Sequence, residues 1–177
     1  MVASHLTTVA TPAAEQRMIV RRALRAGDIA AISDLHRRVY GLEFDLDERF
    51  VAAVARSVHD AVAAGWPERG GAVWLIERDG ELAGSLGLTD EGDGIGRVRW
   101  FVFEPELRGR GLGRSLIDEL LAEARAASLR MLELETFSAL AVAAHLYRDA
   151  GFELRSAATT DKWGPKIVYQ RYELDLA

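Results

Sequence analysis

The pattern of hydrophobic and polar positions predicts a chain in which short strands and amphipathic helices follow one another. Four apolar residues between positions 29 and 39 recur at helical spacing, and Asp28 is the expected N-cap of that helix. A second helix is expected to begin at Asp45, with Glu48 as its capping-box partner. Strands are expected at residues 19–23, 72–77, 81–88, 95–103, 132–136, 153–156 and 169–176, and helices from residue 116 and over residues 139–150.

Two connections carry clear turn signals. Asp79-Gly80 separates two strand patterns and predicts a tight hairpin. Residues 157–166 contain Gly-Pro and are expected to form a loop between the last two strands.

The segment R-G-R-G-L-G-R-S, residues 108–115, lies between the apolar strand pattern V-R-W-F-V-F and a helical pattern. Its three glycines allow the backbone to turn tightly and to approach a ligand without a Cβ in the way. The start of a helix offers unpaired backbone N–H groups and the positive end of the helix dipole. Three arginines add positive charge. Together these features predict a site for a phosphate or pyrophosphate.

The spacing of the glycines narrows the kind of loop. A P-loop would need Gly where Arg108 stands and Lys where Arg114 stands, and a dinucleotide-binding fingerprint would need its third Gly at Arg114. The segment has instead the form Arg-x-x-Gly-x-Gly, at Arg108, Gly111 and Gly113. This form resembles the acyl-CoA pyrophosphate loop of the GNAT superfamily of N-acetyltransferases. The alternative is an arginine-rich, solvated helix start, in which the glycines would only weaken the helix.

The resemblance extends over roughly residues 18–176. The stretch L-Y-R-D-A-G-F at residues 146–152 is similar to a signature in the second half of GNAT domains, and A-G-D-I at residues 26–29 resembles the start of their first helix. The segment W-F-V, the following P-E and R-G-R-G-L-G, and the later Trp163-Gly164 are closest to acetyltransferase domains that are sometimes fused to MarR-type regulators. We expect no such DNA-binding domain in this sequence.

The resemblance implies an α/β (α+β) fold. Residues 18–177 would form one GNAT-like domain, with a central mixed, largely antiparallel, splayed sheet flanked by helices. Residues 1–17 would form a flexible tail.

Composition is consistent with one soluble domain. The chain has 177 residues, of which 49% are hydrophobic and 28% charged. The absence of cysteine excludes disulfides, thiolate metal ligands and a cysteine nucleophile. The four histidines show no ligand spacing, so we expect no metal. A net charge of −5 argues against nucleic acid as a partner, and no apolar run approaches the roughly 20 residues of a membrane span. The first residues lack the pattern of a signal peptide, and we expect a cytoplasmic protein.

The resemblance also implies roles for individual residues. Acetyl-CoA would be the co-substrate, with its acyl arm along Phe101, Val102 and Phe103. Its pyrophosphate would be held by the loop residues Arg108, Gly109, Arg110, Gly111, Leu112, Gly113, Arg114 and Ser115. Tyr147 would be the general acid that protonates the leaving thiolate.

Glu135 is the first candidate for the general base and Glu104 the second, and Glu133 has the same strand parity as Glu135. Alternatively, Tyr147 is a packing residue and the glutamates are solvated strand-end carboxylates. Relatives often have Asn where this chain has Leu140, which leaves one contact to the CoA arm open.

The acceptor is the least determined part. Tyr40, Glu43, Phe44 and Trp163 could form an aromatic, acidic pocket for an ammonium group, or the aromatics could lie in the core or in a homodimer interface. The favoured function is an acetyl-CoA-dependent N-acetyltransferase acting on a primary amine of a small molecule or peptide. Two alternatives are a non-catalytic acyl-CoA-binding or sensor domain, and an enzyme of the same fold that uses another acyl group or an oxygen acceptor.

Overall fold

The computed structural model of the chain describes residues 17–176. The predicted tail, residues 1–17, therefore lies outside the described residues except for Arg17. The backbone N–H of Arg17 donates to the carboxylate of Asp79 at 3.2 Å, and its carbonyl accepts from the backbone N–H of Asp79 at 3.0 Å.

Within the described residues, seven strands form one sheet in the order β1-β2-β3-β4-β5-β7-β6. Every neighbouring pair is antiparallel except β4 and β5, so the predicted mixed, largely antiparallel sheet is confirmed. The strands are β1 (Met18–Arg21), β2 (Gly71–Arg78), β3 (Glu81–Gly92), β4 (Ile95–Phe103), β5 (Met131–Phe137), β6 (Glu153–Thr160) and β7 (Ile167–Asp175).

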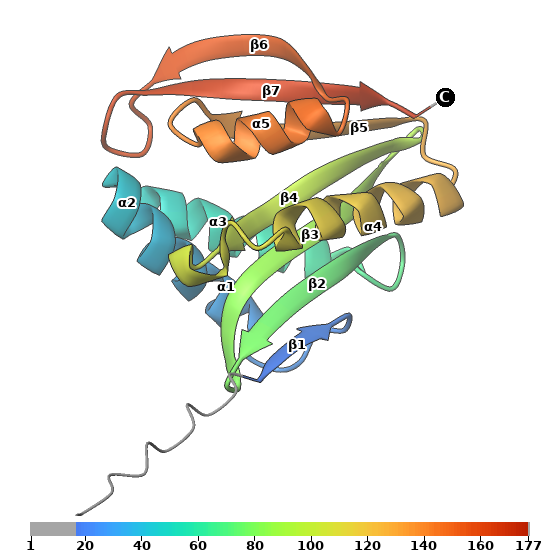
Figure 1. Ribbon diagram of the computed structural model, residues 1–177, viewed down its shortest axis with the longest axis horizontal. Helices are drawn as coiled ribbons and strands as arrows, with labels where there is room; N and C mark the ends of the chain where they lie inside the picture. The colour runs from blue at the N-terminus through green and yellow to red at the C-terminus, as the bar shows by residue number, and fades with distance from the viewer. Residues whose placement is uncertain (1–16, 177) are drawn as a thin grey trace, which may run out of the picture.

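The parallel pair β4–β5 is short. It runs only from Ile95 opposite Met131 to Val98 opposite Leu134, although both strands continue beyond these residues. Figure 1 shows β4 and β5 converging at one end and diverging toward the loop that precedes α4. The predicted splay is therefore present, and it leaves the second half of β4 without a strand partner on the β5 side.

A bulge lies in the same half of β4. Ser85 pairs with Val102 and Gly87 pairs with Arg99, so two residues of β4 lie opposite one residue of β3. One of the two, Trp100, has a φ of +50°, and its carbonyl accepts a bond of 2.5 Å from the Ser85 hydroxyl. The bulge inverts the alternation of side chains along the strand: Val98 packs against one face of the sheet, while Trp100 and Val102 pack against the other.

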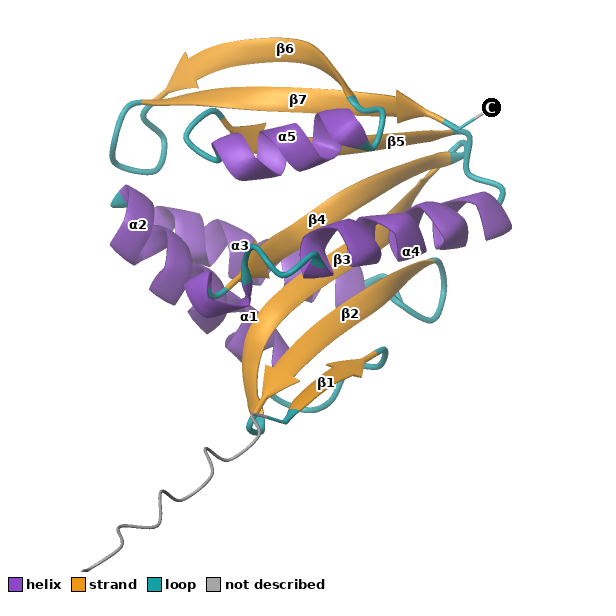
Figure 2. Cartoon of the chain, in the orientation of Figure 1, coloured by secondary structure: helices purple, strands orange, loops and turns teal. Residues whose placement is uncertain are grey.

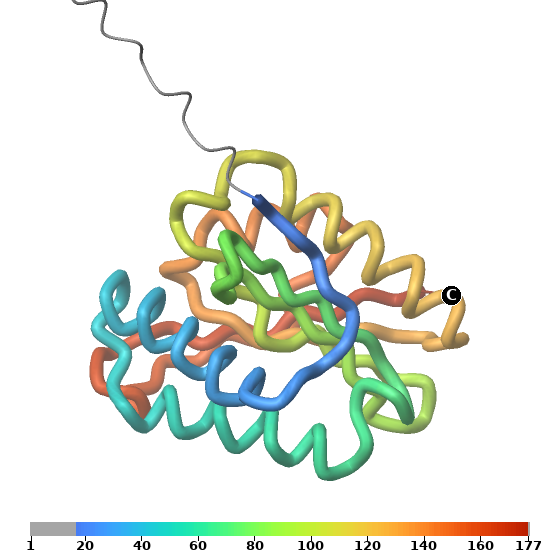
Figure 3. The backbone as a smooth tube through the Cα atoms, turned by 90° about the horizontal axis from the view of Figure 1, so that it is seen from below, coloured from blue at the N-terminus to red at the C-terminus, as the bar shows by residue number. Residues whose placement is uncertain are grey.

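Helices cover both faces of the sheet (Figures 2 and 3). One face packs against α1 (Asp28–His36), a π-helical turn (Arg37–Gly41), α2 (Leu42–Phe44) and α3 (Glu48–Ala63). The other face packs against α4 (Leu112–Ala126) and α5 (Ala141–Asp149), and a 3-10 turn (Pro105–Leu107) leads from β4 toward α4. Two hydrophobic cores result, one on each side of the sheet.

Several helix starts differ from the sequence prediction. Gly27, with a φ of +92°, is the N-cap of α1, and Asp28 is the first helical residue. Its buried carboxylate binds the Arg21 guanidinium at 2.7 and 2.8 Å and accepts from the backbone N–H of Arg25. An ion pair with a neighbouring strand has therefore replaced the expected local cap.

The second helix begins later than predicted. Asp45 lies in the left-handed region at φ +53° and ends α2, whereas Asp47 caps α3 by accepting from the Arg49 backbone N–H at 2.9 Å. The expected start at Asp45 is wrong because two acidic residues, two positions apart, carry the same capping chemistry.

Two further element boundaries differ from the sequence prediction. Helix α4 begins at Leu112, before the apolar stripe that predicted a start at residue 116. Strand β6 continues to Thr160, so the predicted loop at residues 157–166 is shorter than expected. All but the last residue of β6 are exposed, and an exposed strand gives no alternating pattern to read.

Candidate functional site

Two cavities meet at the splayed half of β4. One, of about 280 Å³, lies between β4, the loop before α4 and the start of α5, and is called the α5 cavity. The other, of about 240 Å³, lies between α1, α3 and strands β4, β5 and β7, and is called the α3 cavity. Tyr40, Phe101 and Leu140 line both of them. The two spaces therefore approach one another from opposite faces of the sheet at these three residues.

The α5 cavity contains the strand residues that the resemblance assigns to an acyl arm. Phe101, Val102 and Phe103 all line it. This half of β4 lies beyond its pairing with β5, so its outer backbone edge faces the cavity rather than a strand. An extended ligand can bond such an edge as an additional strand would, although the carbonyls of Phe101 and Phe103 already accept hydrogen bonds from Tyr40 and Arg108.

The loop at one end of the α5 cavity leaves backbone donors free. Gly109 and Gly111 have φ values of +71° and +79°, and the first helical bond of α4 runs from the Ser115 N–H to the Gly111 carbonyl at 3.1 Å. Among residues 17–176, the N–H groups of residues 109–114 have no backbone acceptor. Six neighbouring N–H donors without backbone acceptors at a helix N-terminus are the arrangement that suits an anion.

The arginines of the loop differ in their surroundings. Arg108 forms a two-pronged ion pair with Glu43, at 2.7 Å to each carboxylate oxygen, and also donates to the Phe103 carbonyl. Arg114 pairs with Asp149 of α5 at 2.5 Å. Arg110 is exposed and has no ion pair with the described residues. Arg108 and Arg114 thus connect the loop to α2 and α5. The charge of Arg110 is not paired with a carboxylate of the described residues, so it can interact with a bound anion.

Gly113 keeps the cavity open beside the loop. A Cβ added at this position would lie 3.3 Å from a methyl group of Leu146 and 3.7 Å from the rings of Phe101 and Phe103. Because Gly113 also lines the α5 cavity, a larger side chain would fill space between the loop and the strand.

Tyr147 is a buried residue of α5 that lines the α3 cavity near Phe101. Its residue is 5% exposed, and its ring lies 6.2 Å from that of Phe101, 6.0 Å from Phe152 and 6.2 Å from Tyr172. Its hydroxyl forms no hydrogen bond with the described residues, although the residue lines the α3 cavity. Burial, and to a smaller extent the neighbouring Tyr40, raise the pKa of Tyr147, so its proton stays on the phenol at neutral pH.

Glu135 is the candidate base that faces the α3 cavity. It lines the cavity, and the Tyr169 hydroxyl donates to its carboxylate at 2.8 Å. Glu104 lines neither cavity and is held between Arg38 at 3.0 Å and Arg78 at 2.7 Å. The geometry therefore separates the two candidates that the sequence left open.

Glu133, which shares the parity of Glu135, is engaged by two arginines. It bonds Arg97, and it accepts from Arg171 at 2.8 Å. Burial acts to raise the pKa of Glu133, but the hydrogen bonds and charges of the two guanidinium groups outweigh it and hold that pKa below the usual range. A carboxylate so paired is a poor proton acceptor.

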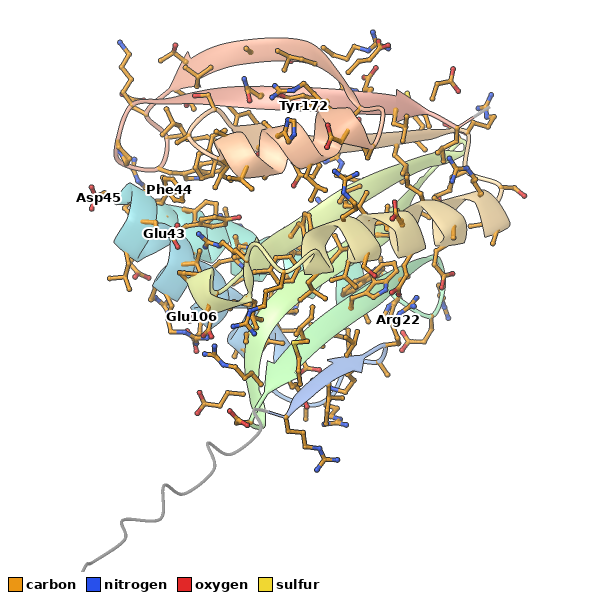
Figure 4. The ribbon with its side chains drawn as sticks, viewed as in Figure 1. Arg22, Glu43, Phe44, Asp45, Glu106 and Tyr172 are labelled. Carbon is orange, nitrogen blue, oxygen red and sulfur yellow. The ribbon has the colours of Figure 1, made fainter. Side chains whose placement is uncertain are left out.

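Three of the four expected acceptor residues line the cavities, but they do not share one cavity. Tyr40 lines both, Trp163 lines the α3 cavity and Phe44 lines the α5 cavity. Glu43 lines neither cavity and is bound to Arg108. Figure 4 labels Glu43 and Phe44 side by side on α2.

Sequence reasoning missed the three basic residues that line the α3 cavity. His36 is 3% exposed, and its Nδ1 lies 2.8 Å from the Ile32 carbonyl, so Nδ1 donates the proton and Nε2 is the acceptor. Burial lowers the pKa of His36 to about 4. Arg97 and Arg99 line the same cavity. Two arginines alternating with apolar residues in a central strand were the available signal, since such strands bury both faces.

Two further properties bear on the kind of protein. In residues 17–176, no helix is both long and apolar enough to cross a membrane. No group of three or more His, Cys, Asp or Glu side chains among these residues is arranged to hold a metal ion.

Comparison with known proteins places this chain in a family. The model of the acetyltransferase (GNAT) family matches residues 30–152. The uncharacterized N-acetyltransferase YjgM of Escherichia coli is 32% identical over 146 residues, which cover 79% of this chain and 84% of that protein.

Solved structures share the fold at lower identity. An acetyltransferase of the GNAT family from Staphylococcus aureus has a TM-score of 0.71 and 16% identity, covering 91% of this chain and 100% of that one. A putative acetyltransferase, yncA, from Salmonella typhimurium, solved with its cofactor acetyl-CoA, has a TM-score of 0.64 and 20% identity, covering 91% and 95%.

Proposed function

Because the chain belongs to the acetyltransferase (GNAT) family, we propose that it transfers the acetyl group of acetyl-CoA to a primary amine of a small molecule or peptide. The observation that carries the proposal is the meeting of the two cavities at Tyr40, Phe101 and Leu140. One cavity ends at an anion-binding loop, as the donor requires. The other approaches the same point from the opposite face of the sheet, as a second substrate requires.

The residues around the α5 cavity fit acetyl-CoA. The free N–H groups of residues 109–114 and the charge of Arg110 suit its pyrophosphate. The unpaired edge of β4 suits the amide-containing arm, and Gly113 leaves room between the two. When bound, acetyl-CoA supplies an acetyl group activated as a thioester.

Two side chains of the α3 cavity, Glu135 and Tyr147, can account for both proton movements. A C–N bond forms between the acetyl carbon and the amine as the C–S bond breaks. The amine gives up a proton, and Glu135 accepts it directly or through water. The thiolate of CoA gains a proton from Tyr147, whose hydroxyl has no other acceptor among the described residues. Tyr40 holds the Phe101 carbonyl by a bond of 3.2 Å and fixes the local course of β4.

The alternative of a non-catalytic acyl-CoA-binding domain is less well supported. Such a domain needs the loop and the α5 cavity, but it has no need for a second cavity with a carboxylate at its wall. The nearer likeness to domains fused with MarR-type regulators rests on sequence motifs alone. A cytoplasmic location, a homodimer and the absence of nucleic-acid or membrane partners also stay predictions.

Calorimetry with CoA and a CoA-release assay test the proposal together. The wild-type protein should bind CoA and release it from acetyl-CoA with at least one member of a panel of amines, amino acids, polyamines and peptides. Gly113→Val should weaken CoA binding sharply, because the new side chain meets Leu146 and the two phenylalanines of the cavity.

A control substitution distinguishes a blocked CoA site from an unfolded protein. Gly80 is in the β2–β3 hairpin at φ +89°, and a Cβ added there would have no neighbouring atom within 4 Å, so Gly80→Ala should lower stability and leave CoA affinity unchanged. Unchanged CoA affinity in a folded Gly113→Val variant would contradict the assignment of the donor site. CoA binding without release on any acceptor would favour the non-catalytic alternative.

A further inference from the structure

The α3 cavity has a basic wall of which only part is neutralised. Arg97 is bound to Glu133 through two nitrogens of its guanidinium group. Arg99 has no such partner: its nearest carboxylate, that of Glu91, is 3.9 Å away, and the Arg99 side chain donates no hydrogen bond to the described residues. A guanidinium group carries five N–H donors and stays charged in proteins.

Arg99 is also partly withdrawn from water. Its side chain is 25% exposed and its guanidinium carbon lies 5.3 Å from the centre of the Trp100 ring. Burial lowers the pKa of Arg99, because the charged guanidinium group loses contact with water and has no counter-ion at hydrogen-bonding distance. An anion that entered the α3 cavity would gain hydrogen bonds and relieve that cost.

The rest of the cavity favours an amine with an apolar body. Phe50, Trp163 and Tyr169 line it with aromatic rings, and Glu135 adds one negative charge. Phe50 and Trp163 are 5.1 Å apart, and Trp163 and Tyr169 are 5.5 Å apart, so the rings form one continuous wall. The cavity therefore combines a cation, an anion and an apolar surface.

We propose that the acceptor is an amino acid with an apolar or aromatic side chain, and that Arg99 binds its carboxylate. The proposal rests on the proposed function and names the substrate class of the same site. Arg99 and Phe101 lie on either side of the bulged residue Trp100 of β4, and both line the α3 cavity. A carboxylate at Arg99 thus lies near the junction where the amine must meet the donor, with the side chain against the aromatic wall.

A pair of substrates that differ in one group tests the role of Arg99. L-phenylalanine carries the carboxylate, and L-phenylalaninamide replaces it with a neutral amide. Their amines differ in pKa, so the measure is the ratio of the two kcat/KM values in each variant, compared with wild type. In Arg99→Gln the preference for phenylalanine over its amide should fall at least tenfold. Arg99→Lys should retain part of it, because the charge remains.

The control is Arg56→Gln, which removes the same charge from the exposed side of α3. Arg56 lines neither cavity, so its substitution should leave the ratio unchanged. If Arg56→Gln and Arg99→Gln lose the preference to a similar extent, the effect comes from the net charge of the protein and not from a contact with Arg99. That result would overturn the proposal. An unchanged ratio in Arg99→Gln would also overturn it.

Binding without turnover gives a second measurement. The CoA-loaded wild-type protein should bind 3-phenylpropionate at least tenfold more tightly than 3-phenylpropanamide, and Arg99→Gln should remove the difference. This result would stand even if no amine were acetylated, so failure of the proposed function and failure of the carboxylate site are distinguishable. Equal binding of the acid and the amide to wild type, or no binding of either, would contradict the site. Circular dichroism of each variant checks that it is folded.

Discussion

The hydroxyl of Tyr40 donates a hydrogen bond to the carbonyl oxygen of Phe101 at 3.2 Å. Phe101 lies in the splayed, bulged part of β4, where the strand has left β5 and its register against β3 has shifted. A side chain from the helical layer thus satisfies a carbonyl in an irregular part of the sheet. The bond fixes the strand where the two cavities meet.

We therefore expect Tyr40→Phe to impair the site more than the fold. The ring still packs against Phe50 and Phe137, at centroid distances of 5.5 and 5.7 Å. Loss of the bond should lower the free energy of unfolding by about 1 kcal/mol. The kcat/KM should fall roughly tenfold, an amount equal to about 1.4 kcal/mol in the barrier. Urea unfolding and steady-state kinetics measure the two effects, and an unchanged kcat/KM would show that the bond is only structural.

Tyr147→Phe tests the proposed acid. The change keeps the ring among Phe101, Phe152 and Tyr172 and removes only the hydroxyl, which bonds none of the described residues. Stability and CoA affinity should survive, while kcat should drop by about 10²-fold or more. Tyr172→Phe is the control, because Tyr172 is also buried, lines neither cavity and loses only a bond of 3.4 Å to Gln170. Full turnover in Tyr147→Phe, with chemistry limiting the rate, would pass the role to another donor.

Features set by local pattern could be predicted from the sequence. Strand β4 has the predicted bounds, residues 95–103, and the Asp79-Gly80 hairpin lies where its turn signal placed it. The glycine loop is local in the same sense, because its spacing alone positions its donors at the start of a helix.

Features set by partners far along the chain could not be predicted. Glu43 and Arg108 are 65 residues apart, and the sequence around neither residue predicts that they form an ion pair. The bulge at Trp100 depends on how β3 and β4 align, which the strand pattern does not contain. His36 looked like an isolated histidine. Its place on the α3 cavity follows only from the packing of α1 against the sheet.

The identity of the general base stays a prediction, and Glu135 is the candidate that lines the α3 cavity. If Glu135 accepts the amine proton, Glu135→Gln should lose rate most near neutral pH, where an alkyl amine with a pKa near 10.4 is almost all protonated. The defect should shrink as pH approaches the pKa of the amine, because solvent then supplies the neutral form.

The control for this prediction is Glu104→Gln. Glu104 is held by Arg38 and Arg78 and lines neither cavity, so its substitution should lower stability but leave the shape of the pH–rate profile unchanged. An altered profile in Glu104→Gln alone would reverse the assignment. Unaltered profiles in both variants would show that no dedicated carboxylate deprotonates the acceptor.

The burial of His36 predicts that the protein loses stability in acid. Its pKa is lowered by burial from 6.5 to about 4. Above pH 6.5 the residue is neutral in both the folded and unfolded states and contributes no pH dependence. Between pH 6.5 and 4, His36 is protonated in the unfolded chain but stays neutral in the folded protein. The free energy of unfolding therefore falls as the pH falls. The linkage amounts to about 3 kcal/mol in total and levels off below the folded pKa.

His36→Asn isolates this effect, because an asparagine amide can still donate to the Ile32 carbonyl, as Nδ1 does at 2.8 Å, but cannot be protonated. The variant should be less stable than wild type at pH 7, where it loses the packing of the ring against Tyr40 and Phe50. That difference should shrink by about 3 kcal/mol between pH 7 and pH 4. Carboxylates such as Glu133, whose pKa the neighbouring arginines hold below its usual range, are present in both proteins, so their contributions cancel in the comparison. Urea unfolding of the two proteins across this range measures it, and a difference that does not change with pH would mean that His36 accepts its proton in the folded state.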